Sequence, residues 1–194
     1  MIRQRLGPLA IVLLLGSGCS DNAPPDSKSE TQPPATAETK PAPAGDTQTP
    51  TSAPGFAQAA AVGGLYEVES SRLAMMKAGA AEVRQFAEMM IADHTATTEQ
   101  LKQIASTTTP AIALPMQPDA RHQNMLNELM MLEGANFDRR YVAQQTEAHR
   151  EAIMLMEGFA ERGDQQDLKQ FAAATAPKIR MHLQMVEQLG QQQR

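Results

Sequence analysis

Apolar residues recur at spacings of three and four along most of the chain after residue 55, which is the period of an α-helix with one buried face. No stretch there alternates apolar and polar residues with the period of two that a half-buried β-strand requires. We therefore expect an all-α fold with four long helices and one short helix. The predicted helices cover Phe56–Ala78, Ala80–Ser106, about 120–133, Ala135–Arg162 and about 165–189.

Glycines separate the predicted helices into two pairs. Gly79 and Gly163 mark tight breaks, so the helices on either side of each should form an antiparallel hairpin. The segment between Ser106 and Ala135 is long enough to cross from one hairpin to the other. The pattern thus predicts an antiparallel four-helix bundle over residues 56–190, with a short extra helix in the crossover.

Aspartates stand where two helices should begin. Asp119 is a candidate N-cap for the short helix, and Gly134 a candidate stop after it. Asp164, with Asp167 three residues later, has the spacing of a capping box at the start of the last helix.

Residues 1–18 have the order of features of an export signal. Met1–Arg5 is positively charged, Leu6–Leu15 is mostly apolar, and Gly16–Gly18 are small. The apolar run is too short for a stable membrane span. The only cysteine, Cys19, follows at once, as in the bacterial lipobox, where this residue is lipidated. We expect a lipoprotein signal peptide and a lipid anchor at Cys19; the alternative is an ordinary cleaved signal with an incidental cysteine.

Residues 19–55 are expected to comprise the lipidated Cys19 and a disordered tether rich in Pro, Thr and Ala. Eight of the 13 prolines lie between residues 20 and 54, whereas all seven Phe and Tyr residues lie at or after Phe56. A stretch of this composition cannot bury enough apolar surface to offset its ordering entropy. A flexible chain of this length spans roughly 30–35 Å.

The charge of the chain bears on its partners and its location. The formal net charge is −5 and no basic stripe is present, which argues against nucleic acid as a partner. We expect contact with the membrane through Cys19 alone. Ser20 after that cysteine favours the outer membrane, with the bundle facing the periplasm. The sequence leaves a protein or cell-wall partner and the oligomeric state open.

Four polar residues interrupt the apolar faces of the long helices, one on each helix: Glu69, His94, His149 and His182. The first three lie close to the midpoints of their helices, which share one height in an antiparallel bundle. The fourth is displaced by about 8 Å at 1.5 Å per residue.

Imidazole and carboxylate groups suit iron, zinc, manganese or copper. One hypothesis is therefore a single ion of one of these metals inside the bundle, held by those four residues. Glu67, Asp93 and Glu147 would be hydrogen-bond partners of the ligands. A di-iron site is not indicated, because no carboxylate stands three residues before a seam histidine.

The alternative hypothesis is a non-enzymatic cell-envelope module that binds a protein or the cell wall, in which the polar residues only set the helix register. The methionines, whose thioethers bind copper(I), are spaced as helix packing alone would space them. No motif favours an enzyme, since the sequence has neither a glycine-rich phosphate loop nor a Gly-x-Ser-x-Gly turn.

Four motifs resemble the bacterial family catalogued as domain of unknown function 4142. They are Gly63–Glu69, Phe86–Thr95, Phe137–Val142 and Pro177–Leu183, one in each long helix. The resemblance covers about Phe56–Leu189 and implies a ferritin-like bundle in an exported, outer-membrane protein. It implies no activity.

Several of the candidate residues lie within these motifs. Glu67, Glu69, Asp93, His94 and His182 occupy matching positions. The histidine of the remaining long helix matches a family Asp-His pair only in part, because an alanine precedes it in this sequence.

Overall fold

The structure is a computed structural model that describes residues 50–192. The predicted signal segment, the lipidation site Cys19 and most of the predicted tether lie outside the described residues. Five helices are present: α1 Ala53–Lys77, α2 Ala81–Thr107, α3 Ala120–Met130, α4 Gly134–Arg162 and α5 Gln166–Gln192. Within the described part of the chain, no helix is long and apolar enough to cross a membrane.

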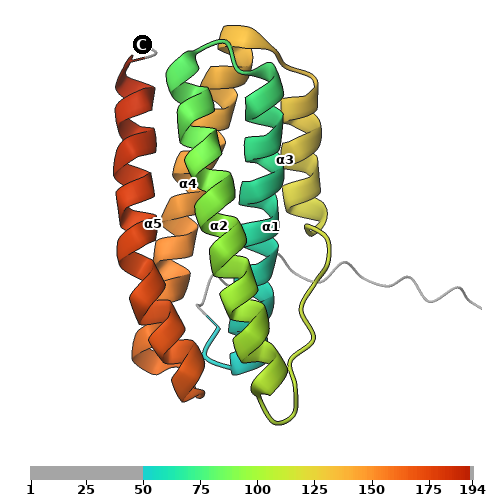
Figure 1. Cartoon of the computed structure of the whole chain (residues 1–194), viewed down its shortest axis with the longest axis vertical. Helices are drawn as coiled ribbons and strands as arrows, with labels where there is room; N and C mark the ends of the chain where they lie inside the picture. The colour runs from blue at the N-terminus through green and yellow to red at the C-terminus, as the bar shows by residue number, and fades with distance from the viewer. Residues whose placement is uncertain (1–49, 193–194) are drawn as a thin grey trace, which may run out of the picture. The chain divides into compact units, whose positions relative to one another are not determined.

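The four long helices pack as a bundle of two antiparallel hairpins, α1–α2 and α4–α5 (Figure 1). Each long helix packs against two others, because α1 also contacts α4 and α2 also contacts α5. The connection from α2 returns to the opposite end of the bundle through α3, which packs mainly on α1 (Figure 1). The predicted all-α bundle with a short helix in the crossover is confirmed.

The start of α1 differs from the prediction. The helix begins at Ala53, so the last three residues of the predicted tether are helical. Pro54 lies in the first turn, where a helix tolerates proline because the N–H groups there have no partner within the helix.

Asp164 caps a different helix from the one expected. Its Oδ1 atom accepts a hydrogen bond of 2.7 Å from the backbone N–H of Ala53, at the start of α1. The cap of α5 is Gln165, whose Oε1 atom accepts from the N–H of Leu168 at 2.6 Å. The capping box predicted for Asp164 and Asp167 is therefore wrong, because tertiary packing brings the α4–α5 turn to the beginning of α1.

The other end of the bundle is held in a similar way. The buried carboxylate of Asp138, on α4, accepts hydrogen bonds from Gly79 N–H at 3.0 Å and Ala80 N–H at 2.9 Å, in the α1–α2 turn.

The predicted N-cap of α3 is confirmed, since Asp119 accepts from the N–H of His122. Gly134, the predicted stop, has a φ of 56° and begins α4.

The core consists of two apolar clusters. The first contains Phe56, Leu101, Phe159 and Phe171, and the second contains Phe86, Leu129, Phe137, Tyr141 and Val186. In each long helix, the residues of the two clusters are separated by a short stretch. That stretch holds Glu67 in α1, His94 in α2, His149 in α4 and His182 in α5. A polar layer thus separates the two apolar clusters.

Candidate metal centre

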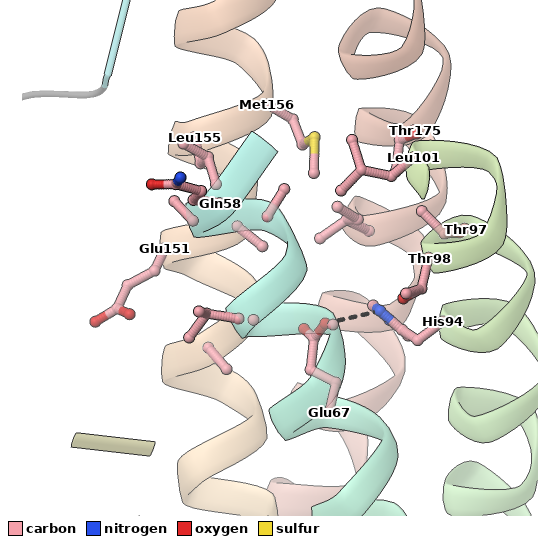
Figure 2. A pocket seen from close by; sticks show the side chains of 18 of the residues that line it. Gln58, Glu67, His94, Thr97, Thr98, Leu101, Glu151, Leu155, Met156 and Thr175 are labelled. Carbon is pink, nitrogen blue, oxygen red and sulfur yellow. Dashed lines mark ion pairs between the residues drawn. The ribbon is translucent and has the colours of Figure 1, made fainter. Parts of the chain in front are cut away.

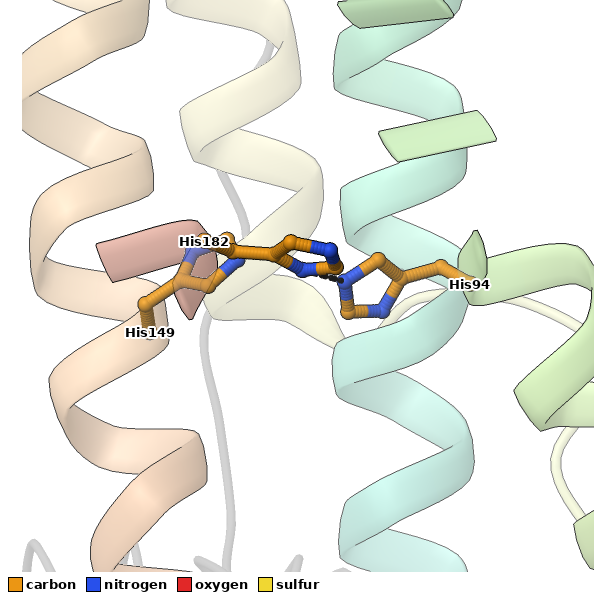
Figure 3. Close-up of side chains that lie close together, drawn as sticks. All are labelled: His94, His149 and His182. Atoms are coloured by element: carbon orange, nitrogen blue, oxygen red, sulfur yellow. Dashed lines mark hydrogen bonds between the residues drawn. The ribbon is translucent and has the colours of Figure 1, made fainter. Parts of the chain in front are cut away.

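Three histidines from three different helices meet in this polar layer. His94 of α2, His149 of α4 and His182 of α5 each offer a ring nitrogen, and these nitrogens all lie within 4.8 Å of one another. The side chains are buried, with exposed fractions of 6% for His94 and 0% for the other two. Figure 3 shows the three rings together in the bundle interior.

Carboxylates hold two of the rings in place. His94 Nδ1 donates to Glu67 Oε2 at 2.7 Å, and this carboxylate is buried (Figure 2). His182 Nε2 donates to Asp93 Oδ2 at 2.9 Å. Asp93 is held in turn by the ammonium group of Lys178, also at 2.9 Å. A carboxylate accepts but does not donate when ionised, so these contacts place a proton on His94 Nδ1 and on His182 Nε2.

The third ring is fixed by its own helix. His149 Nδ1 donates to the backbone carbonyl of Gln145, one turn earlier in α4, at 2.7 Å. Since a carbonyl only accepts, the N–H of the neutral ring is at Nδ1 and the lone pair is at Nε2. His149 Nε2 is buried and has no hydrogen-bond partner among the residues that the structure describes.

These hydrogen bonds leave a lone pair on one nitrogen of each neutral ring. In particular, His94 Nε2 and His182 Nδ1 lie 3.3 Å apart (Figure 3). When both rings are neutral, this contact brings two lone pairs together. It becomes favourable only when a proton or a metal cation lies between the two nitrogens.

Burial and charge set the protonation of His149, His182 and Glu67. Burial lowers the pKa of His149, and it lowers the pKa of His182 to about 4 despite the hydrogen bond to Asp93. Burial alone would raise the pKa of Glu67, but the adjacent His94 and the two other histidines outweigh it and hold that pKa below its usual value. Neutral imidazoles beside an ionised carboxylate are the forms that bind metal cations.

Glu67 takes the position that the sequence analysis gave to Glu69. Two residues along a helix turn the side chain by about 200°, so the two glutamates point in nearly opposite directions. Glu67 is buried at the histidines, whereas Glu69 is only half-buried and does not belong to the cluster.

The error arose from the composition of α1. Its buried face consists largely of small residues, which are Ala53, Ala57, Ala61, Gly64, Ser70, Ser71 and Ala74. Phe56 and Tyr66 are fully buried as well, whereas Leu73 is half-buried and Met76 is exposed. Following Leu73 and Met76 back along the helix therefore selects the stripe that holds Glu69 and misses Glu67.

Two of the three predicted hydrogen-bond partners contact the histidines. They are Glu67 and Asp93. The third, Glu147, is exposed on α4, two residues before His149 and on the other side of that helix. The sequence analysis did not anticipate Lys178, although its spacing of four residues before His182 places both on one face of α5.

A cavity of about 580 Å³ adjoins the cluster, and Glu67, His94 and His182 form part of its wall. It extends between α1 and α4 to residues near the surface, such as Gln58 and Glu151 (Figure 2). Its inner wall includes the apolar side chains of Leu101 and Met156 (Figure 2). The periodic pattern of the sequence gave no sign of this cavity, because small side chains on a helix face produce no distinct signal.

Comparison with known proteins identifies the family. The model of the family described as domain of unknown function DUF4142 matches residues 38–189. The chain belongs to this family. No curated protein matches the sequence of this DUF4142 protein.

Two solved structures resemble the DUF4142 bundle. CopM in its Cu(II)-bound form matches with a TM-score of 0.62 and 16% sequence identity, covering 73% of this chain and 97% of that chain. A candidate secreted protein of family DUF305 from Streptomyces coelicolor matches with a TM-score of 0.61 and 18% identity, covering 71% of this chain and 89% of that chain. At these identities the likeness shows the shared helical fold alone.

Proposed function

We propose that this protein binds one transition-metal ion in the interior of its bundle, through His94 Nε2, His149 Nε2 and His182 Nδ1. Glu67 and Asp93 would orient two of these rings and increase their basicity, and the Gln145 carbonyl would orient the third. The function is metal binding at the cell envelope, with no catalytic step assigned.

The observation that carries the proposal is the contact of 3.3 Å between His94 Nε2 and His182 Nδ1. Two nitrogens bound to one tetrahedral ion at about 2.0–2.1 Å lie about 3.3 Å apart. The two rings are thus already spaced as ligands of one ion. The buried nitrogen of His149 without a hydrogen-bond partner supplies a third donor in the same layer.

Copper(II) is the ion that we favour among iron, zinc, manganese and copper. Sites made of nitrogen and oxygen ligands bind copper(II) most tightly among the divalent ions of the first transition row. The likeness to the Cu(II)-bound protein CopM supports this choice. Zinc, with three histidines and one further position, would be the next expected occupant.

Metal content tests the proposal directly. The full chain, purified without a histidine tag and equilibrated with copper(II), should hold about one equivalent by elemental mass spectrometry. The variants His149→Gln and His182→Gln should lose it while retaining the helical circular dichroism spectrum. Glu69→Gln is the matched control, because it changes a glutamate of α1 that does not belong to the cluster, and it should keep the ion.

A protein that folds but binds no metal would give the opposite answer. A folded wild-type protein that takes up no copper, zinc, iron or manganese would refute metal binding. The polar layer would then serve only to set helix register, and the function would lie with an envelope partner.

A further inference from the structure

A glycine that packing does not require lines the cavity beside the histidines. A Cβ atom added at Gly63 would meet nothing within 4 Å, although Gly63 lies in the middle of α1 and lines the cavity. Its neighbour Gly64 is different, because a Cβ atom there would approach Thr98 Oγ1 to 2.8 Å. Glycine inside a helix is destabilising relative to alanine. Close helix packing favours a glycine at position 64, whereas the space around Gly63 would admit a side chain.

The proposed metal centre has fewer protein ligands than an ion needs. The three histidines supply three nitrogens, and Glu67 Oε2 is already engaged by His94 Nδ1. A tetrahedral ion with three protein ligands keeps a fourth position for an exogenous ligand. Because His94, His182 and Glu67 all border the cavity, that position can be reached from it.

The charges of the layer favour an anion in that position. A divalent ion and the Glu67 carboxylate together leave one positive charge, since Asp93 is paired with Lys178. An uncompensated charge at a buried site is costly, and one monoanion would neutralise it.

Glu67 adds a second requirement for the ligand. Its Oε1 atom is buried and accepts no hydrogen bond from the residues that the structure describes, and the side chain belongs to the cavity wall. The N–H of His149 Nδ1 lies 3.8 Å from this oxygen but already donates to the Gln145 carbonyl. A buried carboxylate oxygen that accepts no hydrogen bond is unfavourable, so a ligand that brings an O–H or N–H group would satisfy it.

We propose that the open coordination position binds a small organic monoanion that carries a hydrogen-bond donor, such as a short hydroxycarboxylate. The anionic group binds the metal ion and the hydroxyl donates to Glu67 Oε1. The aliphatic part of the ligand rests on the apolar wall formed by Leu101, Met156 and Ile179. This inference rests on the proposed metal-binding function.

Two probe anions distinguish the need for a negative charge from the need for a hydrogen-bond donor. The copper(II)-loaded full chain is titrated with 3-hydroxypropanoate and with 3-methoxypropanoate, which have the same charge but differ in the O–H donor. The electron paramagnetic resonance and visible spectra should shift saturably with both, and 3-hydroxypropanoate should bind about tenfold more tightly.

Substitutions at Gly63 test whether the anion reaches the metal ion through the cavity. Gly63→Leu would place a bulky side chain at the cavity wall and should weaken binding of both anions at least tenfold, with the copper content unchanged. Gly63→Ala is the matched control, because its Cβ atom enters open space, and it should bind both anions as the wild type does.

The failure of this inference differs from the failure of the proposed function. A wild-type protein that holds one copper ion, with spectra that neither anion changes, would overturn the open position and leave metal binding intact. Equal affinity for the two anions would overturn the role of Glu67 Oε1. Wild-type anion affinity in a folded Gly63→Leu variant would overturn the cavity as the route, and a protein that takes up no copper would refute both proposals.

Discussion

Each of the three buried histidines uses one ring nitrogen in a hydrogen bond and leaves the other available. The acceptors are Glu67 Oε2, Asp93 Oδ2 and the Gln145 carbonyl oxygen. Such acceptors fix the tautomer and the orientation of a ring before a metal arrives.

The histidines should make the stability of the metal-free protein depend on pH. Burial lowers the pKa of His182 to about 4, from 6.5 in the unfolded chain, and it also lowers the pKa of His149. Between these two values the unfolded chain binds protons that the folded protein does not, so acid favours unfolding. The full contribution is present above pH 6.5 and is lost as the pH falls toward 4.

Urea unfolding of the protein in the presence of a chelator measures this effect. At 1.36 kcal/mol per pKa unit, we expect the free energy of unfolding to fall by at most about 3 kcal/mol for His182 between pH 7 and pH 4. The His182→Gln variant should show a shallower dependence. A free energy that stays constant from pH 7 to pH 5 would contradict the buried, neutral state of this ring.

The positions of the helices could be predicted from the sequence. The buried face could be predicted for α2, α4 and α5 but not for α1. Large apolar residues mark the buried stripes of α2, α4 and α5, so His94, His149 and His182 were found from their spacing. In α1 the buried stripe consists largely of Ala, Gly and Ser beside Phe56 and Tyr66, and the same reasoning selected Glu69 in place of Glu67. Small residues allow helices to approach closely, but they carry little hydrophobic signal.

Caps that come from distant residues are also invisible in the sequence. Asp164 precedes α5 in the chain but accepts its hydrogen bond from Ala53, which is 111 residues away. A helix N-terminus needs an acceptor for its unpaired N–H groups, and local spacing does not say which helix an aspartate will serve.

Removing this cap should destabilise the bundle. We expect Asp164→Ala to lower the free energy of unfolding by about 1 kcal/mol, because the N–H of Ala53 loses its acceptor at the start of α1. Asp167→Ala is the matched control, since Asp167 does not cap α1 and its side chain is exposed. Thermal unfolding of both variants measures the difference, and equal effects would contradict the assignment of the cap.

On the scale of the whole molecule, the bundle consists of two apolar clusters with a polar layer between them. Phe56 and Phe159 stack in one cluster, with ring centroids 4.0 Å apart, and Phe137 and Tyr141 stack in the other at 5.8 Å. The two clusters supply the apolar burial that stabilises the fold. The layer between them can therefore hold groups that would not stabilise the bundle by packing alone.

We propose that Cys19 is lipidated and anchors the bundle in the outer membrane, with residues 20–52 as the connection. The full chain expressed in bacteria should partition into the detergent phase of a Triton X-114 extract, and Cys19→Ser should move it to the aqueous phase. Ser20→Ala is the control that should keep the anchor. Aqueous partitioning of the wild-type protein would exclude lipidation.

The most direct test of the central claim is a crystal structure of the copper-loaded protein, with anomalous diffraction recorded at the copper absorption edge. One strong anomalous peak about 2.0 Å from His94 Nε2, His149 Nε2 and His182 Nδ1 is the result that we predict. The hydrogen bonds from His94 to Glu67 and from His182 to Asp93 should be retained. An empty histidine layer in that crystal, or copper bound only at the surface, would contradict the account.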